Sequence, residues 1–447
     1  MFDNRFPVSF FTKSKISIIF VVIPSLILVV LISVFGVNVI IGDEWAIVPY
    51  FEKLFEKKIS IEDLFSPHNE HIIFFPKIVM LFNALVFKYN SKLQMFLGLF
   101  FIFLNFLLIS KKLYELLEKD FNISHLILPS FAIFTMRQWE NLLYGWQFQI
   151  PMAVFFVLFS FYCLSYIEKS NIYFLLAIVS SIIASFSFGN GILVWFIGLF
   201  IIYSKIGFKK EFFIWLIFSI IIIIFYFNVY VESLSSSNSS LYRSRNVINI
   251  IIYFITSTGS SLTTEKYSAF VIGILLISLY FYSLKNYKEY IFWNSIIIFV
   301  IVSLFIVAIS RSGFGWQSAI ASRYVSFSIL LPVSIYSIFL HRSYLGEGKN
   351  IFRLIIMLFF IQIITSFANY FKYEIVYNEN KIEENILKNY KQKTNKDLMP
   401  DLSKIEYLKE INPKLYNKIY DDFLKAGDIK KNGCAILEKY HLSIFKS

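Results

Sequence analysis

The chain has 447 residues, of which 57% are hydrophobic and 20% aromatic, while only 16% are charged. Its mean hydropathy is +0.64, and a soluble domain rarely combines so much apolar surface with so little charge. The net charge of +12 does not indicate a nucleic-acid partner, because much of the basic charge falls in short loops between apolar runs, as the positive-inside rule predicts. The two cysteines, Cys163 and Cys434, imply neither a disulfide framework nor a thiolate metal site. We therefore predict an all-α polytopic membrane protein.

The first apolar run, residues 16–41, is long enough to cross about 30 Å of hydrocarbon as a helix. It lacks the short apolar core and small-residue cleavage site of a secretory signal, so we expect an anchor that is retained. The abundance of Ile, Phe, Lys and Asn in the chain is typical of an AT-rich bacterium. We therefore expect a multi-pass protein of the bacterial cytoplasmic (inner) membrane.

The loop after this run, residues 42–92, carries a dense group of ionisable residues. Asp43 and Glu44 follow the apolar run directly, and residues 66–71 read Ser-Pro-His-Asn-Glu-His. Ionisable residues at a membrane boundary are costly to keep dry and usually serve a site. The sequence therefore predicts that the functional site of the protein lies in this loop.

Residues 72–89 decide the predicted topology, because they are apolar but interrupted by Pro76, Lys77 and Asn83. If they cross the bilayer, every later lysine-rich loop lies outside. If they lie along the outer interface as an amphipathic helix, most of these loops lie inside, which the positive-inside rule favours. The N-terminus is then inside, and the active face and C-terminus are outside. Eleven spans follow, near 16–41, 93–110, 122–136, 151–167, 172–188, 191–204, 212–231, 268–284, 291–310, 324–340 and 351–370.

Two domains are predicted from the change in composition after the last span. Residues 1–370 form the transmembrane domain, and residues 371–447 form a small Lys- and Glu-rich domain or tail on the outer face. Within the tail we predict two short amphipathic helices, at about 402–411 and 414–426. Asp401 would cap the first; Pro413 would start the second and Gly427 would end it.

Each polar group admits a functional and a structural interpretation. Asp43 and Glu44 are either a pair poised for base catalysis, in which close carboxylates raise one pKa, or markers of the water boundary. His68, Glu70 and His71 would either ligate a divalent metal, because residues i and i+3 can share a helical face, or bind a phosphate or sugar hydroxyl. They could equally form only a polar loop.

Arginines and tryptophans gather in the predicted outer loops. Arg137 and Arg323 lie at span ends beside aromatic residues, where a planar guanidinium suits phosphate, although interfacial snorkelling explains them as well. The other outer arginines are weaker candidates: Arg243, Arg245 and Arg311. The outer tryptophans would stack on sugar rings or form an aromatic belt: Trp45, Trp139, Trp146 and Trp316. The sequence has no P-loop, dinucleotide fingerprint or Asp-x-Asp motif in a cytosolic loop.

The arrangement of a first span, an outer loop that opens with Asp43-Glu44, and the segment 66–71 followed by Pro76-Lys77 resembles the GT-C glycosyltransferases. These include the protein O-mannosyltransferases and the aminoarabinose transferases of lipid A. The resemblance covers the topology of residues 16–340, and its specific motif about 36 residues. The chain has His-Asn-Glu-His where the family commonly has a Pro-Pro pair. The start of a late span, Ser322-Arg323-Tyr324, is also similar to such membrane proteins.

The resemblance implies an inverting transfer of a sugar from a polyprenyl-phosphate donor to a glycan, lipid or protein acceptor. Asp43 would be the general base. Arg137 or Arg323, with Lys77 or His71, would stabilise the departing phosphate, while Glu44 and Glu70 would position the acceptor or a metal. Glu140, in the loop of Arg137, is assigned to substrate binding with them. No cofactor is required by this scheme, and a divalent metal is left open.

Two other functions are compatible with a polytopic protein. A Wzy-type polysaccharide polymerase also uses lipid-diphosphate sugars and outer-loop arginines, but it gives the acidic pair after the first span no role. A flippase or transporter of lipid-linked oligosaccharides would need charges inside the spans. Here the polar residues gather at one predicted rim, which favours an interfacial enzyme.

Overall fold

The computed structural model describes residues 10–69, 71–234, 246–284, 287–411 and 413–445. Within these ranges the chain is helical throughout, and the one pairing of β type is an isolated bridge between His68 and His71. The all-α prediction is confirmed.

The helices of the first half are α1 (Phe10–Phe35), α2 (Val48–Phe55), α3 (Ile61–Phe65), α4 (Phe74–Phe87), α5 (Ser91–Leu117), α6 (Ile127–Ile133), α7 (Trp139–Leu143), α8 (Gln149–Leu164), α9 (Asn171–Ser185), α10 (Leu193–Ile206) and α11 (Lys210–Leu234). Those of the second half are α12 (Val247–Gly259), α13 (Lys266–Ser283), α14 (Ile291–Arg311), α15 (Val325–Ser328), α16 (Leu330–Tyr344), α17 (Lys349–Ala368), α18 (Tyr370–Lys388), α19 (Leu408–Ile411) and α20 (Pro413–Lys439).

In the part of the chain that the structure describes, nine helices are long and apolar enough to cross a membrane. They are Lys15–Phe35, Ser91–Asp120, Gly145–Leu164, Gly189–Ile206, Lys210–Val229, Lys266–Ser283, Ile291–Phe314, Ser322–Tyr344 and Lys349–Lys388. Each overlaps one of the eleven predicted spans. A polytopic helical membrane protein is therefore confirmed at this level, whereas the number of crossings stays a prediction.

The other two predicted spans are not single long helices. In the span expected at 122–136, α6 has only seven residues, and a new turn starts where the Thr135 hydroxyl accepts a hydrogen bond from the Arg137 N–H at 3.2 Å. In the span expected at 172–188, α9 has 15 residues, which at 1.5 Å per residue is about 22 Å. Each is shorter than the hydrocarbon layer it was expected to cross.

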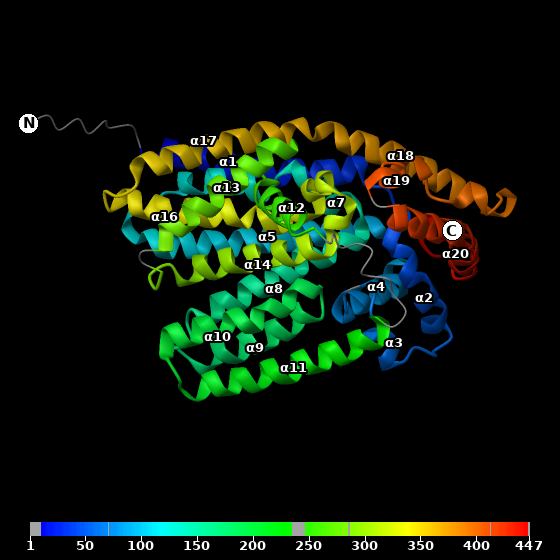
Figure 1. Ribbon diagram of the computed structural model, residues 1–447, viewed down its shortest axis with the longest axis horizontal. Coiled ribbons are helices and arrows are strands. Elements are labelled where there is room, and N and C mark those ends of the chain that lie inside the picture. Colours follow the sequence, from blue (N-terminus) through cyan, green and yellow to red (C-terminus); the bar gives the residue numbers. More distant parts are fainter. Residues whose placement is uncertain (1–9, 70, 235–245, 285–286, 412, 446–447) are drawn as a thin grey trace, which may run out of the picture.

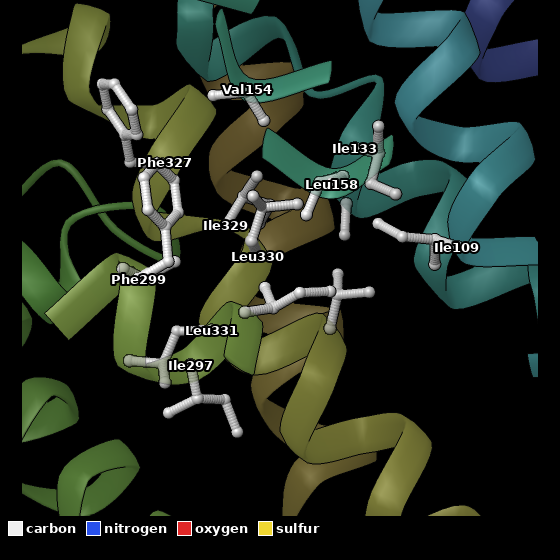
Figure 2. Close-up of a cluster of buried hydrophobic side chains, with 14 of the residues drawn as sticks. Ile109, Ile133, Val154, Leu158, Ile297, Phe299, Phe327, Ile329, Leu330 and Leu331 are labelled. Carbon is white, nitrogen blue, oxygen red and sulfur yellow. The ribbon is translucent and has the colours of Figure 1, made fainter. Parts of the chain in front are cut away.

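The core forms where several long helices meet around α16. Nearly every side chain of α16 is buried, and Figure 2 shows Leu330 and Leu331 among apolar side chains from α5, α6, α8 and α14. Phe299 of α14 and Phe327 of α15 close one side of this cluster, with ring centroids 6.0 Å apart. The outward faces of the long helices remain apolar, for example at Phe218 and Ile221 of α11, as expected of surfaces in contact with lipid.

Helix α4 has the composition expected of an interfacial helix. Its 14 residues would reach about 21 Å, too short to cross the hydrocarbon. One face, with Lys77 and Asn83, is buried against the protein, while Phe82 and Leu85 are more than half exposed. An apolar face of this kind can lie in the outer part of a bilayer.

The C-terminal segment packs against the first loop at one end of the bundle, where Figure 1 places α2, α4 and α20 together. The Lys439 ammonium lies 3.1 Å from the Glu52 carboxylate, and the Ser443 N–H donates to the Lys88 carbonyl at 2.8 Å. The rings of Phe55 and Tyr440 stack with centroids 4.8 Å apart. The described residues of the ranges 371–445 and 42–92 therefore lie on the same side of the helical bundle.

Within the tail the predicted helices are partly wrong. Asp401 caps a turn as expected, by accepting from the Ser403 N–H at 2.9 Å, and Pro413 starts α20. However, α20 continues through Gly427 to Lys439. A Cβ on Gly427 would lie 2.2 Å from the Asn395 carbonyl oxygen, so this glycine permits a close approach of two segments and does not end the helix.

The first prediction concerns sidedness. In a protein whose Cys163 and Cys434 are replaced by alanine, single cysteines at Lys58 and Lys391 should react with an impermeant thiol reagent in whole cells, because both side chains are exposed in the packed loop and tail. A cysteine at Lys111, near the far end of the 27-residue α5, should react only after the membrane is permeabilised. Labelling of Lys58 and Lys391 from opposite sides would contradict the packing of the tail on the loop.

Candidate functional site

The rim of the bundle is organised around the carboxylate of Glu44, which is 1% exposed. After α1, residues 36–41 have no regular secondary structure, and the chain then forms a 3₁₀ turn, Gly42–Ile47 (η1). The Ile41 N–H donates to Glu44 Oε2 at 3.1 Å, and the Tyr89 hydroxyl donates to Oε1 at 3.2 Å. Burial raises the pKa of Glu44 to about 7, even though these hydrogen bonds act in the opposite direction.

Gly145 lets a third segment approach this carboxylate. A Cβ at position 145 would lie 2.7 Å from Glu44 Oε1 and 2.9 Å from the Ser91 carbonyl oxygen, so any larger residue would force the segments apart. The first loop, the start of α5 and the turn before α8 thus meet at Glu44.

Asp43 has the opposite environment from its neighbour. Its side chain is 55% exposed, with Oδ1 3.8 Å from Nε2 of His68. Desolvation alone would raise the pKa of Asp43, but the neighbouring His68 ring and the positive charges of Arg323 and Arg311 hold it below its usual value. The predicted pair therefore divides into an exposed ionised carboxylate and a buried carboxyl that titrates near neutrality, and the cause is burial rather than mutual repulsion.

His68 and His71 face each other across an isolated β-bridge, so they do not share the helical face that the sequence-based hypothesis of metal binding requires. The backbones of His68 and His71 exchange two hydrogen bonds, at 2.8 and 2.9 Å, and Asn69 has a φ of +49°, which asparagine adopts more readily than most residues. The His68 ring packs edge-on against Trp146, with centroids 4.8 Å apart. The predicted ligand Glu70 lies outside the described residues.

His71 faces a different neighbour. Its ring lies 4.1 Å from that of Phe188, and its Nδ1 accepts a hydrogen bond from the Gly189 N–H at 3.3 Å. The short turn Gly189–Ile192 therefore belongs to the same rim. Within the described ranges, no three His, Cys, Asp or Glu side chains come together as a set of metal ligands.

Lys77 is buried beneath the loop. Its ammonium donates to the Asp63 carbonyl, the Ser66 carbonyl and the Ser66 hydroxyl, at 2.8, 2.7 and 2.6 Å, and lies 4.6 Å from the centre of the Tyr50 ring. Burial lowers its pKa to about 8. These three acceptors use the three ammonium hydrogens, so the geometry gives Lys77 the role of joining α3 to α4 and does not support the predicted phosphate contact.

Two distant segments, residues 136–141 and 320–326, are joined by hydrogen bonds. Glu140 Oε2 accepts from the Ser322 hydroxyl at 2.5 Å and from the Arg323 N–H at 2.9 Å. The amide nitrogen of Asn141 donates to the Ser326 hydroxyl, which in turn donates to Gln138. These contacts fix the position of Arg323, whose guanidinium lies 3.8 Å from Glu140 Oε1.

The two predicted phosphate arginines differ in access. Arg137 is 3% exposed, its guanidinium donates to the Ile320 carbonyl, and burial lowers its pKa to about 10. The Arg323 side chain is 46% exposed and its charge acts on Asp43. Arg323 is therefore the better placed of the two to meet a ligand, while Arg137 supports the segment that carries Arg323.

The structure thus links Asp43, His68, Arg323 and Glu140 along one rim, with Glu44 behind it. Sequence reasoning missed Tyr89 and Gly145, and it ranked Arg311 low. The signals available were weak: Tyr89 precedes the polar residues Asn90 and Ser91 at the start of a span, and Gly145 interrupts an aromatic-rich stretch. The other two weaker arginines, Arg243 and Arg245, lie outside the described residues.

No known protein family, curated protein or solved structure shows significant similarity to this chain.

The second prediction follows from Glu44. Its folded-state pKa of about 7 lies above the ordinary value of 4.5, so the folded state binds the proton more tightly than the unfolded state. The resulting stability is fully present below about pH 4.5 and is lost as the pH rises through about 7, a change of about 3 kcal/mol. Glu44→Gln keeps an acceptor for Ile41 and a donor for Tyr89, so its melting temperature in detergent should vary less between about pH 5 and about pH 8.

The matched control is Glu410→Gln, which removes a carboxylate from an exposed position of α19. This variant should keep the pH dependence of the parent protein. Parallel melting-temperature curves for the parent and Glu44→Gln would contradict the raised pKa.

Proposed function

We propose that this chain is an integral membrane glycosyltransferase. It would move a sugar from a polyprenyl-phosphate donor to a hydroxyl group of a glycan, lipid or protein acceptor. The observation that carries the proposal is the exposed Asp43 carboxylate, which lies beside His68 and within the field of Arg323 at one end of an apolar helical bundle. The GT-C resemblance of the first loop, a resemblance in sequence, supports the same proposal.

Asp43 would act as the general base. Its lowered pKa keeps it ionised near neutral pH, and its exposure leaves an oxygen available to an incoming hydroxyl. As the acceptor oxygen forms a bond to the anomeric carbon, its proton passes to Asp43. The bond between the anomeric carbon and the phosphate oxygen breaks, and its electron pair leaves with the polyprenyl phosphate.

Arg323 would stabilise the negative charge that develops on the departing phosphate. The contacts of Glu140 with the Arg323 backbone and guanidinium hold this cation in place before the donor binds, so little reorganisation is needed during the reaction. The guanidinium offers planar pairs of donors suited to phosphate oxygens. In this scheme Glu140 positions Arg323. This role differs from the one predicted for Glu140 from the sequence, which was to bind the substrate directly.

Glu44 would set the geometry of Asp43. The hydrogen bonds of Glu44 with Ile41 and Tyr89 fix the turn η1, and Asp43 is the preceding residue of the same turn. His68 contacts Asp43 from the 68–71 turn and would orient its carboxylate toward the acceptor.

The third prediction tests the base. Asp43→Asn keeps the shape of the side chain but cannot accept the proton, so turnover should fall by about 10²–10⁴-fold. Purified protein in liposomes would be assayed with a panel of radiolabelled undecaprenyl-phosphate sugars, with release of the sugar as the readout. Glu44→Gln is the matched neighbour and should lose less activity. Near-normal turnover in Asp43→Asn, in a protein that consumes one of these donors, would contradict the proposal.

The fourth prediction concerns a divalent metal. A site built from His68 and His71 needs neutral imidazoles, and in the structure the His71 Nδ1 already accepts a hydrogen bond from the Gly189 backbone. We therefore expect turnover to be unchanged by a chelator. A stoichiometric metal in elemental analysis, together with chelator-sensitive turnover that a divalent ion restores, would overturn this expectation.

A further inference from the structure

A polar cavity of about 860 Å³ lies between the ends of α5, α8 and α10. Pockets that bind small molecules typically have volumes of roughly 300–1,000 Å³. The start of α5 lies near the rim, where Lys92 donates to the Ser33 carbonyl close to the end of α1. The 27 residues of α5 extend about 40 Å, so the cavity is at the other end of the bundle from Asp43.

The lining of this cavity is dominated by lysines from three separate segments. It contains five lysines and three glutamates, which gives it a net positive charge. The lysines are Lys111, Lys112 and Lys119 in and after α5, Lys169 after α8, and Lys205 near the end of α10. The positive-inside rule explains lysines in such loops, but it does not require five of them to face one cavity.

One wall of the cavity is stabilised by a network of ion pairs and hydrogen bonds around the carboxylate of Glu115. Glu115 lies 3.1 Å from Lys112 and 3.4 Å from Lys111, and it accepts a hydrogen bond from the Tyr166 hydroxyl. Lys112 also donates to the Ser165 hydroxyl at 3.2 Å and lies 4.6 Å from the centre of the Tyr166 ring. These contacts are all made between residues of the chain, so this wall of the cavity does not need a ligand to form.

The remaining lysines of the lining offer charge to a ligand. Among the described residues, Lys119, Lys169 and Lys205 have no carboxylate within ion-pair distance. Lys169 lies over the Tyr166 ring at 4.5 Å, which orders its ammonium at the edge of the cavity. The other two glutamates of the lining, Glu118 and Glu168, are exposed.

We propose that this cavity binds the phosphate groups of an anionic phospholipid headgroup. Ammonium groups act as point charges toward phosphate oxygens, and basic pockets between membrane helices are suited to doubly charged headgroups such as that of diphosphatidylglycerol. The cavity opens at the ends of candidate membrane spans, where headgroups lie. The proposal does not depend on the glycosyltransferase function.

Full-length protein in a neutral detergent would be titrated with diphosphatidylglycerol and, separately, with phosphatidylcholine, with native mass spectrometry as the readout. Inorganic diphosphate, followed by thermal shift, distinguishes a soluble phosphate from a lipid headgroup. The test variant is Lys169→Gln with Lys205→Gln, and Lys119→Gln is a second, independent variant. The matched control is Lys209→Gln with Lys210→Gln, two exposed lysines at the start of the next helix that do not line the cavity.

We expect diphosphatidylglycerol to bind the parent protein and the control pair alike, and to bind the test pair at least about tenfold more weakly, since each lysine contributes roughly fivefold. Lys119→Gln alone should weaken binding by about fivefold. If inorganic diphosphate binds with the same dependence on these lysines and diphosphatidylglycerol does not bind, the ligand is a soluble phosphate and the proposal is overturned. The proposal is overturned if phosphatidylcholine binds equally well, or if the control pair loses as much affinity as the test pair.

Discussion

The proposed site depends on the contacts that the buried carboxyl group of Glu44 makes with three segments of the chain. It joins the turn after α1 to the start of α5 through Tyr89 and to the turn before α8 through the close approach of Gly145. A carboxylate without water is costly, and the raised pKa of Glu44 shows how this cost is reduced: near neutral pH the group can hold a proton. Because Glu44 points inward, Asp43 on the same tight turn points toward solvent.

The second half of the rim is positioned by polar contacts across more than 180 residues of chain. The carboxylate of Glu140 and the amide of Asn141 bind the segment that carries Arg323, and the enclosed guanidinium of Arg137 supports it from behind. Buried polar groups that are mutually satisfied specify one arrangement of the segments. A cation can therefore be held near Asp43 by elements that are distant in sequence.

The sequence predicted the class of protein well because apolar run length is a direct consequence of hydrocarbon thickness. It also located the first loop, since Asp43 and Glu44 follow the first run directly. It assigned different roles to these neighbours but could not predict their opposite exposure, because the fold of the turn decides which carboxylate is buried. The sequence also failed to predict where a helix is short or interrupted. Thr135, for example, interrupts an apolar run whose composition predicts a membrane span.

Local sequence signals were least informative where tertiary contacts override them. Gly427 resembles a helix stop, yet it lies inside α20 because a neighbouring backbone passes too close for a side chain. The sequence assigns Lys77 to phosphate, yet Asp63 and Ser66 at the C-terminal end of α3 supply all of its acceptors. The deciding partner of Gly427 is distant in sequence, and Ser66, although it belongs to the same motif as Lys77, contacts it only because of how the loop folds.

Asp43 and Glu44 are adjacent carboxyl groups with divergent protonation states, Asp43 ionised and accessible and Glu44 buried and titrating near pH 7. Infrared difference spectroscopy of the purified protein between about pH 5 and about pH 9 measures this directly, through the carbonyl band of protonated carboxyl groups. We expect a band that is lost as the pH rises through about 7, absent from Glu44→Gln and retained in Asp43→Asn. A band that titrates with Asp43, or no band that depends on Glu44, would contradict it.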